Sequence, residues 1–262
     1  MFTPPILSNK HVAQPSVFTP ENLLREARRQ KSLPLKNVPA ICILDPDGDI
    51  VRSLVSERRA ERDPNWACYH TDLYAFTDYN IQFGIVGCAV GASFAVLVAE
   101  ELFASGCELL VSVTSAGQIS ENGNPPYFVL IEKALRDEGT SYHYLPPAEF
   151  SSIRPELLSK LDDLFTHATI QVYRGSTWTT DAPFRETDAA IAHSKNLGIT
   201  GVEMEAAALY AFAEARQKSV VCLAHVTNRM ARMEGDFEKG VAAGSQEALQ
   251  IIGLIARAWE TR

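Results

Sequence analysis

The sequence lacks the patterns that mark metal-binding and disulfide-stabilised proteins. Its five cysteines contain no CxxC pair, and its six histidines have no paired spacing with cysteines or acids, so we expect no metal site. Most of the cysteines lie in or beside apolar runs, which is typical of reduced, buried thiols in a reducing compartment. These features predict an intracellular, cytoplasmic protein.

Long apolar runs and an excess of positive charge are also missing. No apolar stretch reaches membrane-spanning length, and the first ten residues lack the basic-then-apolar pattern of a signal peptide. Acidic residues outnumber Lys and Arg by 32 to 24, which gives a formal net charge of −8. We therefore expect no membrane and no nucleic-acid partner. A small anionic substrate stays compatible with this charge, because a few local arginines can override it.

Two common catalytic patterns are absent as well. The glycine-rich segment Gly84–Gly91 lacks the G-x-G-x-x-G spacing of a dinucleotide site, so an oxidoreductase is the weakest alternative. On its own this segment is typical of a tight turn between a strand and a helix. The chain also has no G-x-S-x-G nucleophile pattern.

Apolar runs alternate with helical patterns over most of the chain. This alternation predicts one α/β domain over residues 39–262, with three layers and helices on both sides of a central twisted mixed sheet. Residues 1–38, with several prolines and a short amphipathic segment, are predicted to form an N-terminal arm. The strands are expected at 40–44, 81–87, 109–113, 127–131, 169–173 and 220–226, and the helices at 21–31, 50–62, 91–105, 155–165, 186–196, 203–216 and 246–259.

Two short segments could bind an anion. In Asp47–Arg52 a glycine turn feeds a predicted helix N-terminus, where the backbone N–H of Gly48 and the guanidinium of Arg52 suit phosphate. The pattern fits an ordinary Asp-Gly turn with a surface arginine equally well. Ser112–Gly117 ends a strand with small hydroxylated residues, which can present donors to an anion or a sugar.

The most specific segment is Thr200–Tyr210, in which Glu203 and Glu205 begin an otherwise apolar, alanine-rich stretch. Their i, i+2 spacing points them to different helix faces, which predicts that at least one is held inside the protein near the helix N-terminus. A buried carboxylate needs donors, and ribose offers two adjacent hydroxyls. Without further information, both acids would simply complement the helix dipole.

Taken together, these segments resemble the purine nucleoside and uridine phosphorylase family over roughly residues 38–258, and V-E-M-E-A-A-A-L-Y is the most specific match. The resemblance implies a phosphorylase/hydrolase-like fold and no cofactor, with inorganic phosphate as co-substrate. It also implies a homo-oligomer, either a dimer or a hexamer built as a trimer of dimers. The roles that it implies are phosphate contacts for Gly48, Arg52, Thr114 and Ser115 and ribose contacts for Glu203, Met204 and Glu205.

At the base end, the resemblance implies contacts from loop residues and from the end of the last strand. Asn228 stands where bacterial purine-specific members carry an aspartate, and the Asn228-Arg229 pair looks more like uridine phosphorylases. The candidates for base binding are Tyr142, His143, Phe184, Arg185 and Asn228. Arg52, Glu205, Asn228 and Arg229 are the candidate catalytic residues.

The chain departs from the family pattern at two points. Ser112 stands where phosphorylases usually carry a second phosphate-binding arginine, and the Gln-x-Arg uracil anchor is missing after Asp181. We therefore predict phosphorolysis of a pyrimidine or 6-oxopurine nucleoside to free base and ribose 1-phosphate, as a pentosyltransferase. The alternatives are a hydrolytic nucleosidase on the same fold and a nucleoside-binding homologue without catalysis.

Overall fold

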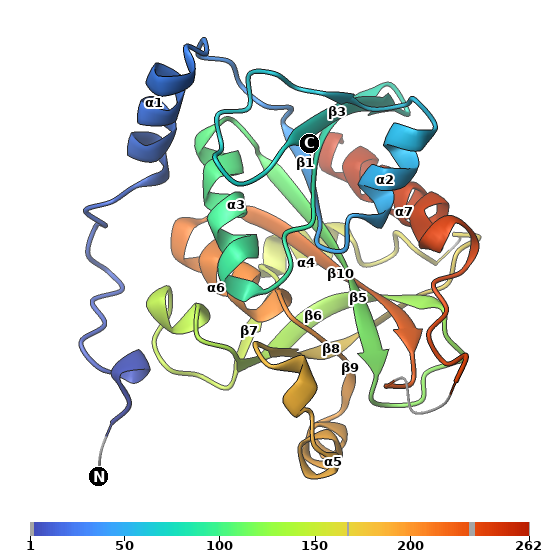
Figure 1. The fold of residues 1–262 in the computed structure, drawn as a ribbon. Coiled ribbons are helices and arrows are strands. Elements are labelled where there is room, and N and C mark those ends of the chain that lie inside the picture. Colours follow the sequence, from blue (N-terminus) through green and yellow to red (C-terminus); the bar gives the residue numbers. More distant parts are fainter. Residues whose placement is uncertain (1–2, 167, 231–233, 262) are drawn as a thin grey trace.

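The computed structural model describes residues 3–166, 168–230 and 234–261. It confirms an α/β domain with a mixed sheet (Figure 1). The helices are α1 (Pro20–Lys31), α2 (Asp49–Ser56), α3 (Ala92–Ala104), α4 (Pro155–Lys160), α5 (Asp188–Asn196), α6 (Ala206–Arg216) and α7 (Ser245–Glu260). The strands are β1 (Ile41–Asp45), β2 (Glu61–Arg62), β3 (Leu73–Asp78), β4 (Ile81–Gly87), β5 (Leu109–Gln118), β6 (Tyr127–Asp137), β7 (Phe150–Ser152), β8 (Val172–Thr180), β9 (Ile199–Glu203) and β10 (Ser219–Asn228).

The sheet combines parallel and antiparallel pairs. β1 lies parallel to β4 and β5, and β10 lies parallel to β5, which brings the carboxyl ends of these strands to one edge. β6 pairs with β10 in the antiparallel sense and with β8 in the parallel sense, and β9 joins β8 to β5. The strands β5, β10, β6, β8 and β9 therefore form a closed circuit, which the alternating pattern of the sequence did not predict.

Helices cover both faces of the sheet, as predicted. α3 packs on α6, and α2 packs on α7. Figure 1 shows the two pairs on opposite sides of β5 and β10. β1 is buried along its whole length, in keeping with a strand covered on both faces. Among the described residues, no helix is long and apolar enough to cross a membrane.

The N-terminal segment lies along one side of the domain (Figure 1). α1 packs on α3 and buries Leu24 and Ala27 against Ala67. A short 3-10 helix, η1 (Pro5–Leu7), contacts another, η2 (Ser141–His143). The segment therefore covers part of the surface formed by α3 and η2.

Several element boundaries differ from the sequence-based prediction. β8 begins at Val172 instead of residue 169 and extends to Thr180, while α2 ends at Ser56 instead of residue 62. The predicted helix 203–216 begins at Ala206, because Glu203 is the last residue of β9. Propensity and periodicity did not reveal β9, whose five residues are buried without an alternating pattern.

Candidate functional site

Glu205 lies at the junction of three chain segments and is 1% exposed. Its Oε1 accepts a hydrogen bond from the Gly91 N–H at 2.7 Å, and its Oε2 accepts from the Thr114 hydroxyl at 2.7 Å. The Met204 N–H also reaches Oε2, at 3.2 Å. Burial, together with the nearby charge of Glu203, raises the pKa of Glu205 to about 7. The glycine-rich turn, the end of β5 and the start of α6 thus converge on one buried carboxylate near the N-terminus of α6.

Glu203 is held by four internal donors. Its Oε1 accepts from the hydroxyls of Thr177 at 3.0 Å and Thr179 at 2.5 Å. Its Oε2 accepts from the N–H groups of Glu205 and Ala206, both at 2.7 Å, which satisfies two of the free donors at the N-terminus of α6. Desolvation raises the pKa of Glu203. These four hydrogen bonds fix Glu203 at the start of α6, and we infer that it positions α6 and the neighbouring Glu205.

The turn between β1 and α2 is built around Gly48, which has a φ of 77°. Its N–H donates to the carbonyl of Asp45 at 2.9 Å and to Oδ1 of the same residue at 3.1 Å. The other carboxylate oxygen of Asp45 accepts from the Val51 N–H at 2.9 Å. Burial raises the pKa of Asp45 to about 7. The N–H predicted to bind phosphate is therefore already paired with an acidic residue.

We expect Gly48→Ala to lower the free energy of unfolding by about 1 to 3 kcal/mol, because alanine rarely adopts a positive φ. An added Cβ would also lie 2.6 Å from Cys88 Sγ and 2.7 Å from Arg52 Nη1. Urea unfolding measures the loss. Gly198→Ala is the matched control, since Gly198 has a φ of 75° but open space around the Cβ position. Equal losses in the two variants would show that the contacts at Gly48 do not constrain the turn.

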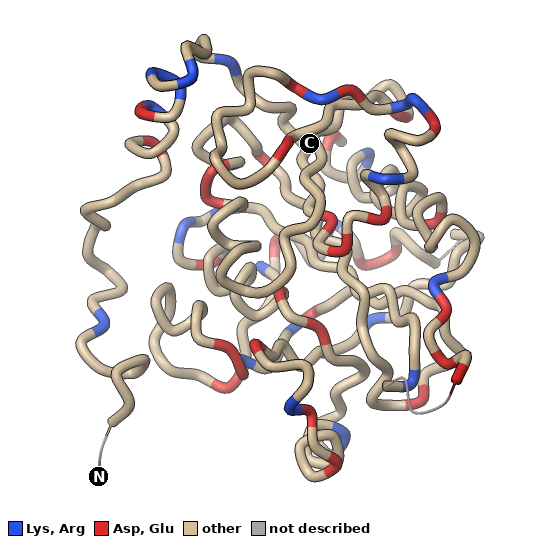
Figure 2. Tube along the Cα trace, viewed as in Figure 1, with Lys and Arg blue, Asp and Glu red and all other residues tan. Residues whose placement is uncertain are grey.

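Asp47 reaches across to the end of β5. Its Oδ2 accepts from the Ser115 N–H at 3.1 Å and, in a short hydrogen bond, from the Ser115 hydroxyl. Lys239 Nζ lies 3.3 Å from the same oxygen and 2.5 Å from Oδ2 of Asp49. Figure 2 shows acidic positions along the turn between β1 and α2. This cluster therefore pairs the hydroxyl that was predicted to bind phosphate with an internal carboxylate.

Arg52 extends from the first turns of α2 and keeps 61% of its side chain exposed. Its Nη2 donates to Asp49 Oδ1 at 2.5 Å and to the Asp47 carbonyl at 2.8 Å. These bonds raise the pKa of Arg52, chiefly through Asp49. The structure thus places Arg52 beside Gly48 and Asp47, as the sequence predicted for an anion site, with its guanidinium paired inside the turn.

Asn228 ends β10 and lies next to the end of β5. Its Oδ1 accepts from the Met230 N–H at 2.8 Å, and its amide donates to the Thr227 hydroxyl at 3.1 Å. Gly117, its register partner on β5, is also paired with Val202, the residue before Glu203. The structure therefore brings Asn228 to the strand ends that carry Ser115 and Glu203. Arg229 is exposed and donates to Asn124 Oδ1 at 2.5 Å.

The two base-site candidates in η2, which packs on α6, make contacts other than with Glu205. The Tyr142 hydroxyl donates to the Arg136 carbonyl at 3.0 Å, and the Arg136 guanidinium lies 4.5 Å from the centre of its ring. His143 faces the N-terminal segment, where Lys10 Nζ lies 3.2 Å from its Nδ1. No hydrogen bond among the described residues joins either side chain to Glu205, Thr114 or Ser115.

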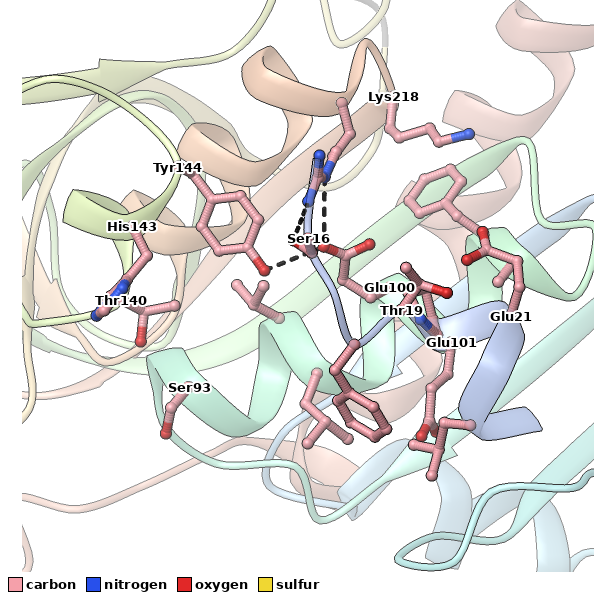
Figure 3. A pocket seen from close by; sticks show the side chains of 18 of the residues that line it. Ser16, Thr19, Glu21, Ser93, Glu100, Glu101, Thr140, His143, Tyr144 and Lys218 are labelled. Atoms are coloured by element: carbon pink, nitrogen blue, oxygen red, sulfur yellow. Dashed lines mark hydrogen bonds and ion pairs between the residues drawn. The ribbon is translucent and has the colours of Figure 1, made fainter. Parts of the chain in front are cut away.

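His143 lines a cavity of about 1110 Å³ between the N-terminal segment, α3, η2 and α6 (Figure 3). In this cavity the Tyr144 hydroxyl donates to Glu100 Oε1 at 3.1 Å. Ser93, two residues after Gly91, also lines it. The cavity therefore begins near the glycine-rich turn and extends away from the cluster around Asp47.

Phe184 and Arg185 lie in the 3-10 helix η3 (Pro183–Arg185), and both are exposed. Phe184 lines a cavity of about 470 Å³ together with Glu186 and Met230. Burial raises the pKa of Glu186 to about 7. Because Met230 also contacts Gly117, this cavity adjoins the end of β5, while Arg185 makes no hydrogen bond to the carboxylate cluster among the described residues.

Sequence reasoning missed Asp47 and Lys239 as site residues. Asp47 was read as a turn residue, and Lys239 follows the acidic segment Asp236–Glu238. The chain after β10 returns to the strand end, because Phe237 bridges to Asn228 and the Glu238 N–H donates to the Thr227 carbonyl at 3.1 Å. A basic residue shortly after a strand-end asparagine was the only sequence signal for this contact.

Comparisons with known proteins identify the family and the fold of the chain. A family model described as "Phosphorylase superfamily" matches residues 40–258. A purine nucleoside phosphorylase, DeoD-type 1, from Shewanella oneidensis is 26% identical over 155 residues, which are 58% of this chain and 66% of the relative. The chain spans 51% and 66% of the lengths of two curated relatives that it matches.

Two solved structures show the same fold at low sequence identity. Uridine phosphorylase from Vibrio fischeri has a TM-score of 0.70 and 21% identity, and the match covers 86% of this chain and 93% of that one. Futalosine hydrolase from Helicobacter pylori has a TM-score of 0.67 and 14% identity, with 82% and 97% covered. The fold is thus shared by phosphorylases and hydrolases. Since the family model spans most of its length, the chain belongs to the phosphorylase superfamily, as a divergent member related to the nucleoside phosphorylases.

Proposed function

We propose that the chain cleaves the N-glycosidic bond of a nucleoside and releases the free base. The observation that carries this proposal is the position of Glu205, a buried carboxylate at the meeting point of the glycine-rich turn, the end of β5 and the start of α6. A carboxylate can accept hydrogen bonds from two adjacent ribose hydroxyls. Met204, which is partly exposed beside it, would contact the sugar.

Cleavage of this bond builds positive charge on the ribose and negative charge on the departing base. Glu205 would orient the ribose and lower the entropy cost of aligning the anomeric carbon with the acceptor. At the base end, Asn228 would bind a base edge and Arg229 would stabilise a departing oxyanion. We therefore propose a pyrimidine or 6-oxopurine nucleoside as the substrate, because each base carries an exocyclic carbonyl oxygen that an arginine can contact.

The acceptor of the ribosyl group is either phosphate or water. Phosphorolysis to ribose 1-phosphate is the chemistry that the sequence predicts from Gly48, Arg52 and Ser115. The pairing of these donors with internal carboxylates favours hydrolysis instead.

The proposed function is tested by incubating the purified chain with uridine, thymidine, inosine, guanosine and adenosine, with and without phosphate, and measuring free base. We expect release from uridine or from a 6-oxopurine nucleoside. Binding of a nucleoside without release of base would identify a non-catalytic homologue. Neither binding nor release across the panel would contradict the proposal.

The base preference gives a separate prediction. We expect Asn228→Asp to shift cleavage toward adenosine, because an aspartic acid can protonate a departing 6-aminopurine and an amide cannot. Relative kcat/KM values for inosine, uridine and adenosine measure the shift, and about 10-fold is expected from a modest share of general-acid catalysis. Thr227→Ser, which keeps the hydroxyl bonded to Asn228, is the control. An unchanged preference would remove Asn228 from the base site.

A further inference from the structure

Every donor that the sequence predicted for phosphate is already bonded to a carboxylate of the chain itself. A phosphate dianion would have to displace groups of its own charge sign, which is unfavourable at these distances. The pairs are Gly48 with Asp45, Arg52 with Asp49, Ser115 with Asp47, and Thr114 with Glu205.

We propose that Asp47, held in place by Lys239, fills the anion subsite from within and makes water the acceptor of the ribosyl group. The enzyme is then a nucleoside hydrolase, and Asp47 is the residue that selects water over phosphate. This inference rests on the proposed cleavage of a nucleoside, and it adds the identity of the acceptor and of the group that activates it.

The two oxygens of Asp47 differ in their contacts. Oδ2 accepts both donors of Ser115 and lies 3.3 Å from Lys239 Nζ. Oδ1 has no hydrogen-bond partner among the described residues. The side chain is 30% exposed, so Oδ1 can accept a hydrogen bond from a water molecule at the open face. Asp47 is therefore held in place through Oδ2, while Oδ1 is available to accept a proton from water as a general base.

Lys239 stabilises the position of Asp47 beside Asp49. Its ammonium group bridges Asp47 and Asp49, whose like charges would otherwise repel each other across Gly48. Its side chain is 20% exposed, which limits solvent screening of the two ion pairs.

A small cavity lies behind this cluster and is lined by Asp47 and Ser115 but not by Arg52. The turn, the end of β5 and the 3-10 helix η4 (Val241–Gly244) enclose a cavity of about 20 Å³. A cavity of this size holds about one water molecule and not the five heavy atoms of phosphate. His225 lines it and is buried, and its Nε2 has no hydrogen-bond partner among the described residues. Desolvation lowers the pKa of His225 to about 4, so this side adds no positive charge to attract an anion.

In the proposed hydrolysis, Asp47 accepts the proton that water loses as it attacks the sugar. A water oxygen bonds to the anomeric carbon while one of its protons passes to Oδ1 of Asp47. The bond between that carbon and the base nitrogen breaks, and its electron pair leaves with the base, which then takes a proton from solvent. Asp47 returns its proton to solvent, so the products are free ribose and the neutral base.

Binding of inorganic phosphate tests the occupied subsite without relying on turnover. By titration calorimetry we expect no phosphate binding to the wild-type chain and measurable binding to Asp47→Ala, which frees Ser115 and Lys239. Glu57→Gln, which removes a carboxylate from the far end of α2, should bind no phosphate. Phosphate binding by the wild-type chain, or its absence in Asp47→Ala with native circular dichroism, would overturn the proposal.

Turnover measurements test whether Asp47 acts as the general base. Asp47→Asn keeps an acceptor for Ser115 but cannot take a proton, so we expect about 100-fold slower hydrolysis. Asp47→Ala in phosphate should form ribose 1-phosphate, while the wild-type chain should form ribose at a rate independent of phosphate. Ribose 1-phosphate from the wild-type chain, or full activity of Asp47→Asn, would overturn the proposal. If no nucleoside is cleaved by any variant, the proposed function fails, and calorimetry alone decides whether Asp47 fills the subsite.

Discussion

Glu205→Gln is expected to lower kcat/KM for the responding nucleoside by about 1000-fold while leaving the chain folded. The amide replaces a charged acceptor with a neutral one, and charge-assisted hydrogen bonds to two ribose hydroxyls contribute about 2 kcal/mol each. A total of about 4 kcal/mol corresponds to about three orders of magnitude in rate. Steady-state kinetics of base release measures the effect.

The control for this variant is another buried glutamate. Glu101 lies on α3, is 1% exposed, and its carboxylate lies beside the Cys68 thiol. Glu101→Gln should therefore keep the activity of the wild-type chain, because this residue lies outside the cluster around Glu205. Full activity in Glu205→Gln would show that ribose is not bound by this carboxylate.

The same substitution changes the pH dependence of stability. The folded-state pKa of Glu205 is raised to about 7 from an ordinary value of 4.5, so its ionisation destabilises the folded chain as pH rises through this window. Glu205→Gln removes this contribution. We expect the decline in unfolding free energy between about pH 4.5 and 7 to be smaller in the variant than in the wild-type chain.

Glu203→Ala is expected to lower the free energy of unfolding by about 3 to 5 kcal/mol. The substitution leaves the hydroxyls of Thr177 and Thr179 and two N–H groups of α6 buried without their acceptor. Urea unfolding of the two proteins measures the loss. Glu214→Ala, on an exposed position near the other end of α6, should change stability by no more than about 0.5 kcal/mol. A loss in Glu203→Ala as small as in that control would contradict the positioning role of Glu203.

The sequence predicted the segments that form the candidate site from local patterns. The turn with Gly48, the strand end with Ser115 and the segment with Glu205 each combine a strand or helix boundary with unusual polar residues. Parallel pairing of β1, β5 and β10 then brings the first two segments to one edge of the sheet. The sequence identified the segments one by one, and the family resemblance, not local pattern, implied that they form one site.

The pairing within the site could not be predicted in the same way. Whether Ser115 donates to phosphate or to Asp47 depends on the direction of a side chain 68 positions earlier in the chain. The contact of Lys239 with Asp49 spans 190 positions. Glu203 was read as a helix residue because its strand, β9, is short and has no alternating pattern. The proposed choice between water and phosphate as acceptor thus rests on contacts between side chains far apart in the chain, which composition does not reveal.

The sugar product formed when the wild-type chain cleaves its nucleoside in excess phosphate tests the central claim most directly. Chromatography of the reaction should show free ribose in equal amount to the released base. Ribose 1-phosphate would contradict the role of Asp47 as the internal occupant of the anion subsite. Absence of both sugars, with every nucleoside left intact, would contradict the cleavage function assigned to the site around Glu205.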